Sequence, residues 1–185
     1  MDIVNVKQKM STLEVTYVSI FIALMAICSW ISIPTAVPFT LQTFAVFMAV
    51  GLLGGKLGTL AVIVYLILGS IGIPVFAGFT SGIGILFGST GGYLFGFILI
   101  ALSYWLITKI LGKKTWVMAT AMGIGLLLCY AFGTAWFMFL YAKTSGPVSL
   151  ATTLGWCVIP FMIPDIIKIA LALIMIKGVR RYVKL

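Results

Sequence analysis

The chain has 185 residues, of which 63% are hydrophobic and only 8% are charged, whereas about a quarter of a soluble domain is charged. This composition excludes an ordinary soluble protein and predicts an integral membrane protein. Histidine is absent, which removes the commonest general base and metal ligand, so we expect no enzymatic activity, no metal site and no cofactor. The net charge of +9 would suit a nucleic-acid partner only if it covered a polar surface, and here the basic residues separate apolar segments.

Six apolar segments follow one another along the chain, with approximate bounds of 13–33, 41–54, 58–73, 92–111, 116–142 and 156–177. The second and third are short for a membrane span, and the glycine-rich stretch between them predicts a tight turn. The first is too long for a secretory signal and lacks its small-residue cleavage pattern, so we expect it to remain as a helix. The pattern predicts an all-α membrane protein whose single domain, 1–185, is a compact bundle of six transmembrane helices.

Lysine and arginine are distributed unevenly among the connections. Ten of the twelve basic residues lie before the first segment, after the sixth, or in the connections that follow the second and fourth. Lys143 alone lies in the opposite connections, and Lys168 lies inside the sixth segment. Because basic loops stay on the cytoplasmic side, we predict that both termini are cytoplasmic.

Asp165 and Lys168 are ionisable residues inside an apolar segment, where they mark a functional site by default. Three residues apart on a helix, they share one face. Two other interpretations stay open. The pair could only hold the sixth helix to the bundle, or Pro160 and Pro164 could start the helix late and leave Asp165 near the outer interface.

Polar side chains open the second segment, beside a turn bounded by Pro34 and Pro38. Thr40 could cap a helix or contact a ligand. Gln42, within an apolar segment, either forms a hydrogen bond between helices or contacts a ligand, and Thr43 adds a hydroxyl group beside it.

The stretch 69–93 on the outer side is rich in glycine, including Gly82, which would allow backbone to approach a ligand closely. Phe76, Phe79 and Tyr93 supply aromatic walls, although aromatic residues also gather at membrane interfaces. With the adjoining polar groups, this stretch predicts a pocket, covered by loops, for a small and partly apolar molecule.

In the first segment, Ser19, Ala23 and Ala26 form a strip of small residues that would let another helix approach, either inside the bundle or from a partner. We interpret Cys28, Cys129 and Cys157 as packing residues, because they are far apart in the sequence. No phosphate-binding loop is found, so any ATP used in transport would be bound by another subunit.

Four stretches resemble one known family. VPFTLQT at 37–43, GIPVFAG at 72–78, GSTGGY at 88–93 and the spacing of Pro160, Asp165 and Lys168 are similar to BioY-type S components, the biotin-binding subunits of energy-coupling factor (ECF) transporters. The chain has Pro164 and Ser89 where that family usually has glycine and proline.

The resemblance implies a six-helix bundle in a prokaryotic cell membrane, with a biotin pocket near the outer face. It implies that Asp165 and Lys168 contact the ligand and that Ser19 and Ala23 lie on a coupling surface. Its partners would be a transmembrane coupling subunit and two cytoplasmic ATPases. Lys168 could donate to the ureido carbonyl or pair with the carboxylate of biotin.

A different class of function is a small secondary carrier or channel that uses Asp165 for proton coupling. Carriers generally contain internal repeats, and no second acid–base pair or second glycine-rich stretch mirrors the first. We therefore favour a binding subunit.

Overall fold

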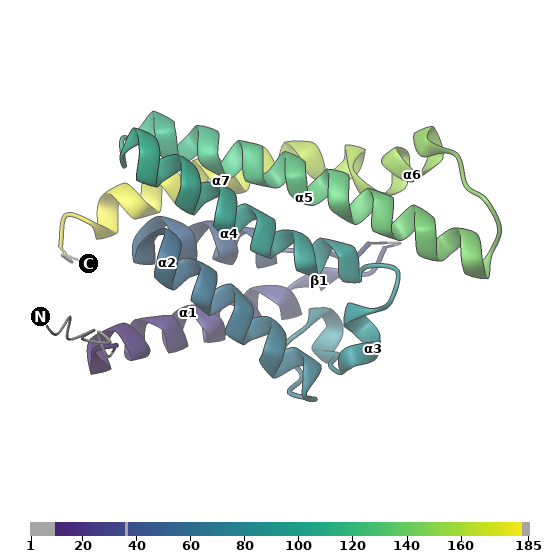
Figure 1. Cartoon of the computed structure of the whole chain (residues 1–185), viewed down its shortest axis with the longest axis horizontal. Coiled ribbons are helices and arrows are strands. Elements are labelled where there is room, and N and C mark those ends of the chain that lie inside the picture. Colours follow the sequence, from purple (N-terminus) through teal and green to yellow (C-terminus); the bar gives the residue numbers. More distant parts are fainter. Residues whose placement is uncertain (1–9, 36, 183–185) are drawn as a thin grey trace, which may run out of the picture.

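A computed structural model describes residues 10–35 and 37–182. Five helices in this part are long and apolar enough to cross a membrane, and they lie side by side in a bundle (Figure 1). They are α1 (Thr12–Trp30), α2 (Gln42–Ser70), α4 (Gly91–Leu111), α5 (Thr115–Thr144) and α7 (Ile159–Val179). The start of α1 and the end of α7 lie at the same end of this bundle (Figure 1).

The second helix, α2, reverses direction at Gly54, whose φ of 79° lies in the left-handed region that glycine adopts without strain. Val50 and Gly58 meet across this reversal, since a Cβ atom on Gly58 would lie 2.7 Å from the Cα atom of Val50. A hydrogen bond of 2.7 Å between Gln42 and Tyr65 joins the far ends of the two segments. The segments therefore run antiparallel.

Small residues let α4 and α5 approach closely along their length. A Cβ atom on Gly125 would lie 2.8 Å from the Cα atom of Ile100, and one on Gly96 would meet Cys129. Such close backbone approach increases dispersion contacts between helices that lack a hydrophobic driving force in lipid. This pair makes the most extensive helix contact in the bundle, and it forms one side of the cavity described below.

Short elements close the other end of the bundle. A two-stranded hairpin, β1 (Ser32–Ile33) and β2 (Phe39–Thr40), connects α1 to α2. The 3-10 helix η1 (Ala77–Phe79) and α3 (Ile83–Leu86) connect α2 to α4, and α6 (Leu150–Cys157) precedes α7.

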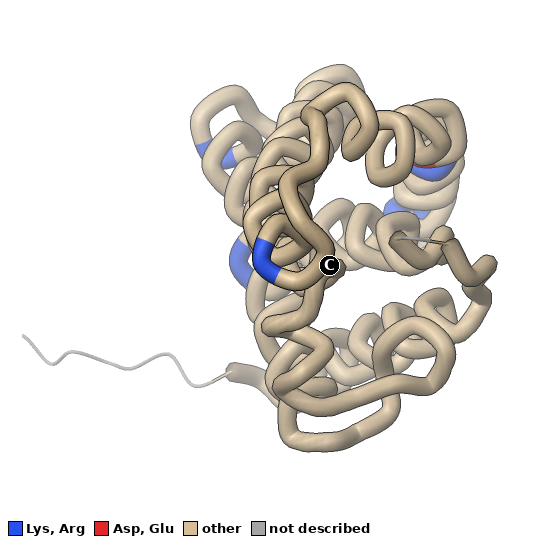
Figure 2. Tube along the Cα trace, turned by 90° about the vertical axis from the view of Figure 1, so that its right-hand side faces the viewer, with Lys and Arg blue, Asp and Glu red and all other residues tan. Residues whose placement is uncertain are grey.

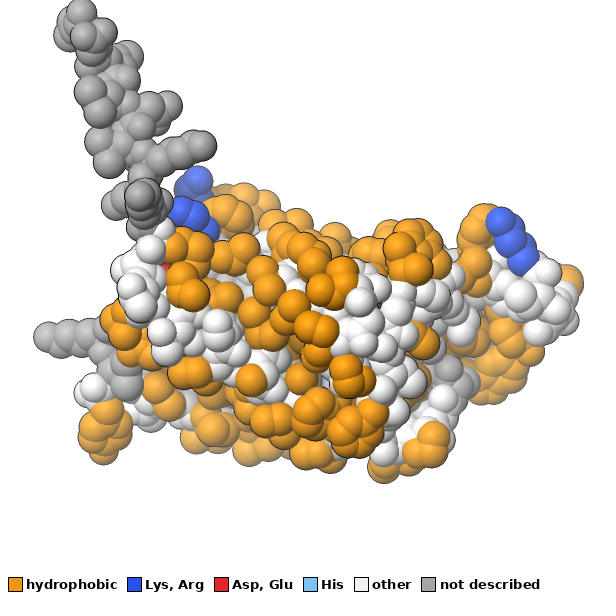
Figure 3. Space-filling view, turned by 90° about the horizontal axis from the view of Figure 1, so that it is seen from below, with side chains coloured by type: hydrophobic (Ala, Val, Ile, Leu, Met, Phe, Trp, Pro, Cys, Tyr) orange, Lys and Arg blue, Asp and Glu red, His pale blue; other side chains and the backbone are white. Residues whose placement is uncertain are grey.

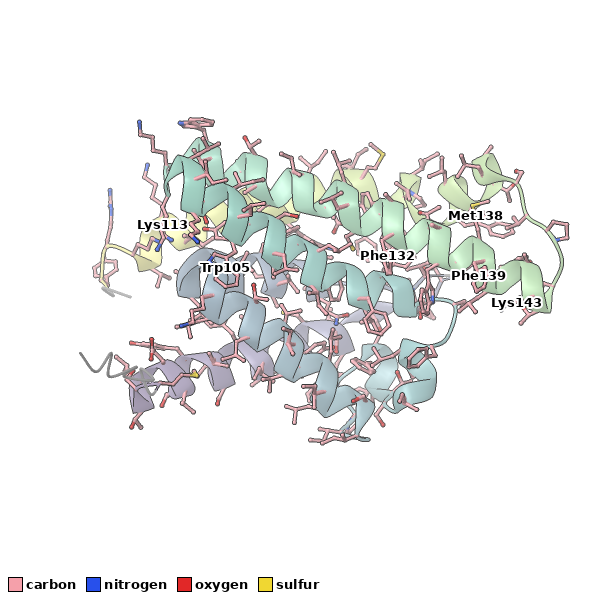
Figure 4. All side chains as sticks on the ribbon, in the orientation of Figure 1. Trp105, Lys113, Phe132, Met138, Phe139 and Lys143 are labelled. Carbon is pink, nitrogen blue, oxygen red and sulfur yellow. The ribbon has the colours of Figure 1, made fainter. Side chains whose placement is uncertain are left out.

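The exterior of the bundle is apolar. Hydrophobic side chains cover much of the face shown in Figure 3, and basic side chains are seen only towards its ends. Viewed along the bundle, the helices surround a common centre and carry few charged positions (Figure 2). Lys113 and Lys143 lie at opposite ends (Figure 4). This arrangement is that of a multi-pass membrane protein, with lipid-facing sides and charged ends.

The structure confirms the all-α membrane bundle and refines its segments. The predicted segments 41–54 and 58–73 are joined in α2, so five helices rather than six meet the length and apolarity of a crossing. The approximate segment 156–177 corresponds to α7, which begins three residues later at Ile159, because Val158 (φ −128°, ψ −55°) separates α6 from α7. Lys7, Lys9 and Lys184, used in the orientation argument, lie outside the described residues.

Candidate ligand-binding site

A cavity of about 260 Å³ lies among the hairpin, η1 and the neighbouring parts of α2, α4, α5, α6 and α7. Its walls are mostly apolar. Seven of the predicted ligand-binding residues line it: Thr40, Gln42, Thr43, Phe76, Tyr93, Asp165 and Lys168. Pockets for small molecules usually span about 300–1,000 Å³, so this cavity lies just below that range and suits a small ligand.

Asp165 and Lys168 form an ion pair in which Nζ lies 2.8 Å from Oδ1. Their exposed fractions are only 2% and 5%. The Thr43 hydroxyl group donates to Asp165 Oδ1 over 2.9 Å and accepts from Lys168 Nζ over 3.1 Å. Lys168 also donates to the Thr40 carbonyl over 2.7 Å. All three N–H donors of the ammonium group therefore have acceptors within the protein.

The other carboxylate oxygen of Asp165 has a different environment. Tyr130, on α5, donates to Asp165 Oδ2 over 2.6 Å, and Oδ2 accepts no other hydrogen bond from the described residues. A carboxylate oxygen can accept two hydrogen bonds. Asp165 Oδ2 thus retains capacity to accept from a donor in the cavity.

The start of α7 explains why this pair faces the cavity. The helix begins at Ile159 and has Pro160 in its first turn, where the missing N–H of proline costs no hydrogen bond. Asp165 lies in the second turn, so the carboxylate is near the end of the bundle that the connections close. Pro160 thus starts the helix as that alternative requires, whereas Pro164 lies inside the helix, and the position of Asp165 relative to the membrane interface stays a prediction.

Gln42 forms the predicted hydrogen bond between helical segments, and it also lines the cavity, where a ligand contact stays a prediction. Its amide donates to the Tyr65 hydroxyl group, which donates in turn to the Val75 carbonyl over 2.7 Å. Ser29 donates to the same carbonyl over 2.6 Å. This network ties the loop before η1 to α1 and to both segments of α2.

The aromatic residues predicted from the glycine-rich stretch separate into two groups. Phe76 is buried against Gly69 and Tyr65 and lines the cavity. Phe79 is 62% exposed and stacks on Trp30, with ring centroids 4.8 Å apart. Gly82, with a φ of 99°, makes a turn. Neither Phe79 nor Gly82 belongs to the cavity lining, so the structure does not bring these two to the site.

Tyr93 and two cysteines form another part of the wall. The Tyr93 hydroxyl group lies 3.1 Å from Thr134 Oγ1, and Cys129 Sγ lies 3.6 Å from the Tyr93 carbonyl. Cys129 and Cys157 line the cavity, whereas Cys28 packs in the core. Burial raises the pKa of the Cys157 thiol, so this thiol adds no charge at neutral pH.

The strip of small residues on α1 divides between two faces. Ser19 and Ala23 are exposed, and the Ser19 hydroxyl group donates to the Val15 carbonyl over 2.9 Å. Ala26 is buried in the core. The alternative of internal packing is therefore correct for Ala26, and of the three small residues only Ser19 and Ala23 are exposed to a partner.

Sequence reasoning missed Tyr130 as a member of the site. Tyrosine hydroxyl groups need a hydrogen-bond partner when they are buried, and Tyr130 stands in the middle of the apolar segment 116–142. A tyrosine at that position was the available signal of a polar partner inside the bundle. The packing of α5 beside α7, which puts the hydroxyl group against Asp165, could not be read from spacing along the chain.

A cavity with apolar walls and one buried ion pair, within a helical bundle that has an apolar exterior, defines a membrane protein that binds a small molecule. The sequence model of the BioY family matches residues 5–185. The chain belongs to the BioY family.

Similar proteins agree with this assignment. The chain is 43% identical to "Biotin transporter BioY" of Thermotoga maritima over 83% of this chain and 87% of that protein. It is 40% identical to "Probable biotin transporter BioY" of Pyrococcus horikoshii over 89% and 94%. The crystal structure of "the S-component for biotin from an ECF-type ABC transporter" superposes with a TM-score of 0.81 at 25% identity, over 95% of this chain and 96% of that chain. These relatives are transport proteins, as predicted, and not enzymes.

Proposed function

We propose that this protein is the biotin-binding S component of an ECF-type importer. The observation that carries the proposal is the buried Asp165–Lys168 pair in an otherwise apolar cavity. An ion pair in a membrane helix is costly unless it serves a site. The names of the relatives supply the identity of the ligand.

The chemistry of the site suits the ureido ring of biotin, which offers two N–H donors and one carbonyl acceptor. We assign an N–H of the ring to Asp165 Oδ2, which accepts only from Tyr130 among the described residues. Lys168 would have to release one of its three protein acceptors to reach a ligand. We therefore propose that the main role of Lys168 is to keep the Asp165 carboxylate charged and oriented.

The remaining parts of biotin would contact other walls. The thiophene ring and valeryl chain would lie against apolar groups such as Phe76 and Phe161. Thr90 lines the cavity beside the first residue of α4 and makes no capping hydrogen bond. Backbone N–H groups at a helix N-terminus attract anions, so we place the carboxylate of the ligand there.

The antiparallel segments of α2 support a chain that crosses the membrane six times. Each segment is about 18–24 Å long at 1.5 Å per residue, which covers most of the roughly 30 Å hydrocarbon core, so we count each as one crossing. The basic end of the bundle, where α1 starts and α7 ends, would face the cytoplasm. This orientation places both termini inside the cell and the cavity towards the outer face.

The coupling partners would approach from the membrane and the cytoplasm. We place a transmembrane coupling subunit against Ser19 and Ala23 on the exposed face of α1, because small residues allow close helix contact. Two cytoplasmic ATPases would supply the energy, since this chain has no phosphate-binding loop.

Uptake of labelled biotin by cells that cannot make biotin tests this function. The chain is produced alone, with a coupling subunit, and with that subunit and its ATPases. We expect full uptake only in the last strain, and loss of uptake when the ATPases are inactivated. Equal uptake in all strains would contradict the proposal and favour a secondary carrier driven through Asp165.

A further inference from the structure

A second cavity, of about 200 Å³, lies at the end of the bundle opposite the hairpin, between the start of α5 and the end of α7. Four basic residues line it: Lys113, Lys177, Arg180 and Arg181. Its other lining residues are Thr115, Met118, Leu173 and Ile176. Met118 and Ile176 are buried whereas three of the basic residues are exposed, so we call the buried apolar part the floor and the basic part the rim.

One of the four cations, Arg180, already forms hydrogen bonds within the protein. Arg180 Nη2 donates to the Gly51 carbonyl over 2.6 Å, and Arg180 Nη1 lies 3.5 Å from the sulfur of Met118. These bonds join the end of α7 to the last turn before the reversal in α2. Lys113 lies on the same side, because its Nζ atom is 3.7 Å from where a Cβ atom of Gly54 would be.

The other three cations have no counter-charge in the described part of the chain. Lys113, Lys177 and Arg181 are exposed and form no ion pair among residues 10–35 and 37–182. The two acids in those residues are committed elsewhere: Glu14 bonds to Ser11 over 2.8 Å, and Asp165 pairs with Lys168. The cavity thus concentrates positive charge that the described residues do not neutralise.

We propose that this cavity binds the phosphate of an anionic phospholipid headgroup. Basic pockets between membrane helices are suited to such headgroups. Trp116 and Ile174 are 62% and 68% exposed next to the lining residues, so lipid-facing apolar surface adjoins the cationic rim. A free phosphate ion would satisfy the cations, but only a lipid would also cover the apolar floor.

Occupancy would stabilise the fold at a defined place. The headgroup would bridge Lys113 in the α4–α5 connection and Lys177 on α7, beside the arginine that holds the reversal of α2. By relieving repulsion among these cations, the headgroup would hold together the α4–α5 connection, α7 and the reversal of α2. The anionic lipid should therefore raise the melting temperature of the protein, because a ligand that binds only the folded state stabilises it.

The experiment uses the full chain in a maltoside detergent, titrated with phosphatidylglycerol, phosphatidylcholine or inorganic phosphate. The test variant is Lys113→Gln/Lys177→Gln/Arg181→Gln. The control variant, Lys56→Gln/Lys109→Gln/Lys114→Gln, removes the same charge from residues that do not line this cavity. Melting temperature and the number of lipids retained in native mass spectra are both measured.

We expect phosphatidylglycerol to raise the melting temperature of the wild type and the control variant. The test variant should bind it about 100-fold more weakly, given the contribution of each basic residue near a membrane surface. Equal loss in the two variants would overturn the proposal in favour of non-specific charge attraction. An equal effect of phosphate or phosphatidylcholine would overturn the assignment to an anionic lipid. If the test variant has a low melting temperature without lipid, the number of lipids retained in native mass spectra replaces the melting temperature as the test. As many retained phosphatidylglycerol molecules in the test variant as in the control variant would then overturn the proposal.

Discussion

The hydroxyl group of Tyr130 on α5 donates to Asp165 Oδ2 on α7 over 2.6 Å. This bond orients the carboxylate from the side opposite Lys168, whose Nζ atom binds Oδ1 over 2.8 Å. Hydrogen bonds to charged groups are shorter and stronger than neutral ones. The carboxylate is therefore fixed at both oxygens, and its remaining capacity faces the cavity.

Replacing Tyr130 by phenylalanine tests this orientation. We expect Tyr130→Phe to weaken biotin binding about tenfold or more, because a hydrogen bond to a charged group contributes roughly 1.5–3 kcal/mol. The measurement is the dissociation constant in detergent. Tyr141→Phe is the control, since it removes a hydroxyl group from the same helix but outside the cavity lining. Equal affinities in the two variants would show that the Tyr130 bond does not matter for binding.

Lys168 should matter for stability as well as for binding. Lys168→Met leaves the Asp165 carboxylate buried without its counter-charge, which costs about 3–5 kcal/mol for a buried pair. We expect a lower melting temperature, partly restored by Asp165→Asn in the same chain, because the double variant has no unpaired charge. Lys143→Met, which removes an exposed lysine at the end of α5 that does not line the cavity (Figure 4), should melt like the wild type. A stable Lys168→Met protein would mean that the pair contributes nothing to the fold.

Two buried tyrosines should respond oppositely to loss of the hydroxyl group. Tyr65 accepts from Gln42 and donates to Val75, so Tyr65→Phe should cost about 1–3 kcal/mol by leaving partners unsatisfied. The Tyr104 hydroxyl group is buried and has no hydrogen-bond partner among the described residues. Tyr104→Phe should therefore leave the melting temperature unchanged or raise it. A large loss in Tyr104→Phe would contradict this difference.

The reversal in α2 can be tested at Gly54. Its positive φ makes alanine unfavourable by roughly 1–2 kcal/mol, so Gly54→Ala should lower the melting temperature. Gly123→Ala is the matched control, because Gly123 lies inside α5 with open space where a Cβ atom would be. Alanine there should be neutral or stabilising by up to about 1 kcal/mol. Identical shifts in the two variants would exclude strain at the reversal.

The sequence predicted those features that depend on local pattern. Apolar runs located the long helices to within a few residues, and the cost of burying Asp165 and Lys168 singled out the pair. Glycine at 54–58 predicted the turn that the positive φ of Gly54 forms.

Features that depend on packing between distant segments were not predictable in the same way. Tyr130 reaches Asp165 only because α5 and α7 are neighbours, and Phe79 turns away from the cavity because Trp30 offers a stacking partner. The break at Val158 is also a tertiary feature, since the hydrophobic pattern runs through it without interruption.

Calorimetric titration of the purified chain with biotin, in the absence of any partner subunit, tests the central claim most directly. We predict submicromolar binding of one biotin per chain, about 100-fold weaker binding by Asp165→Asn because a charged acceptor is lost, and unchanged binding by Glu14→Gln, whose carboxylate only caps α1. Absence of binding by the wild type, or equal binding by Asp165→Asn and the wild type, would contradict the account.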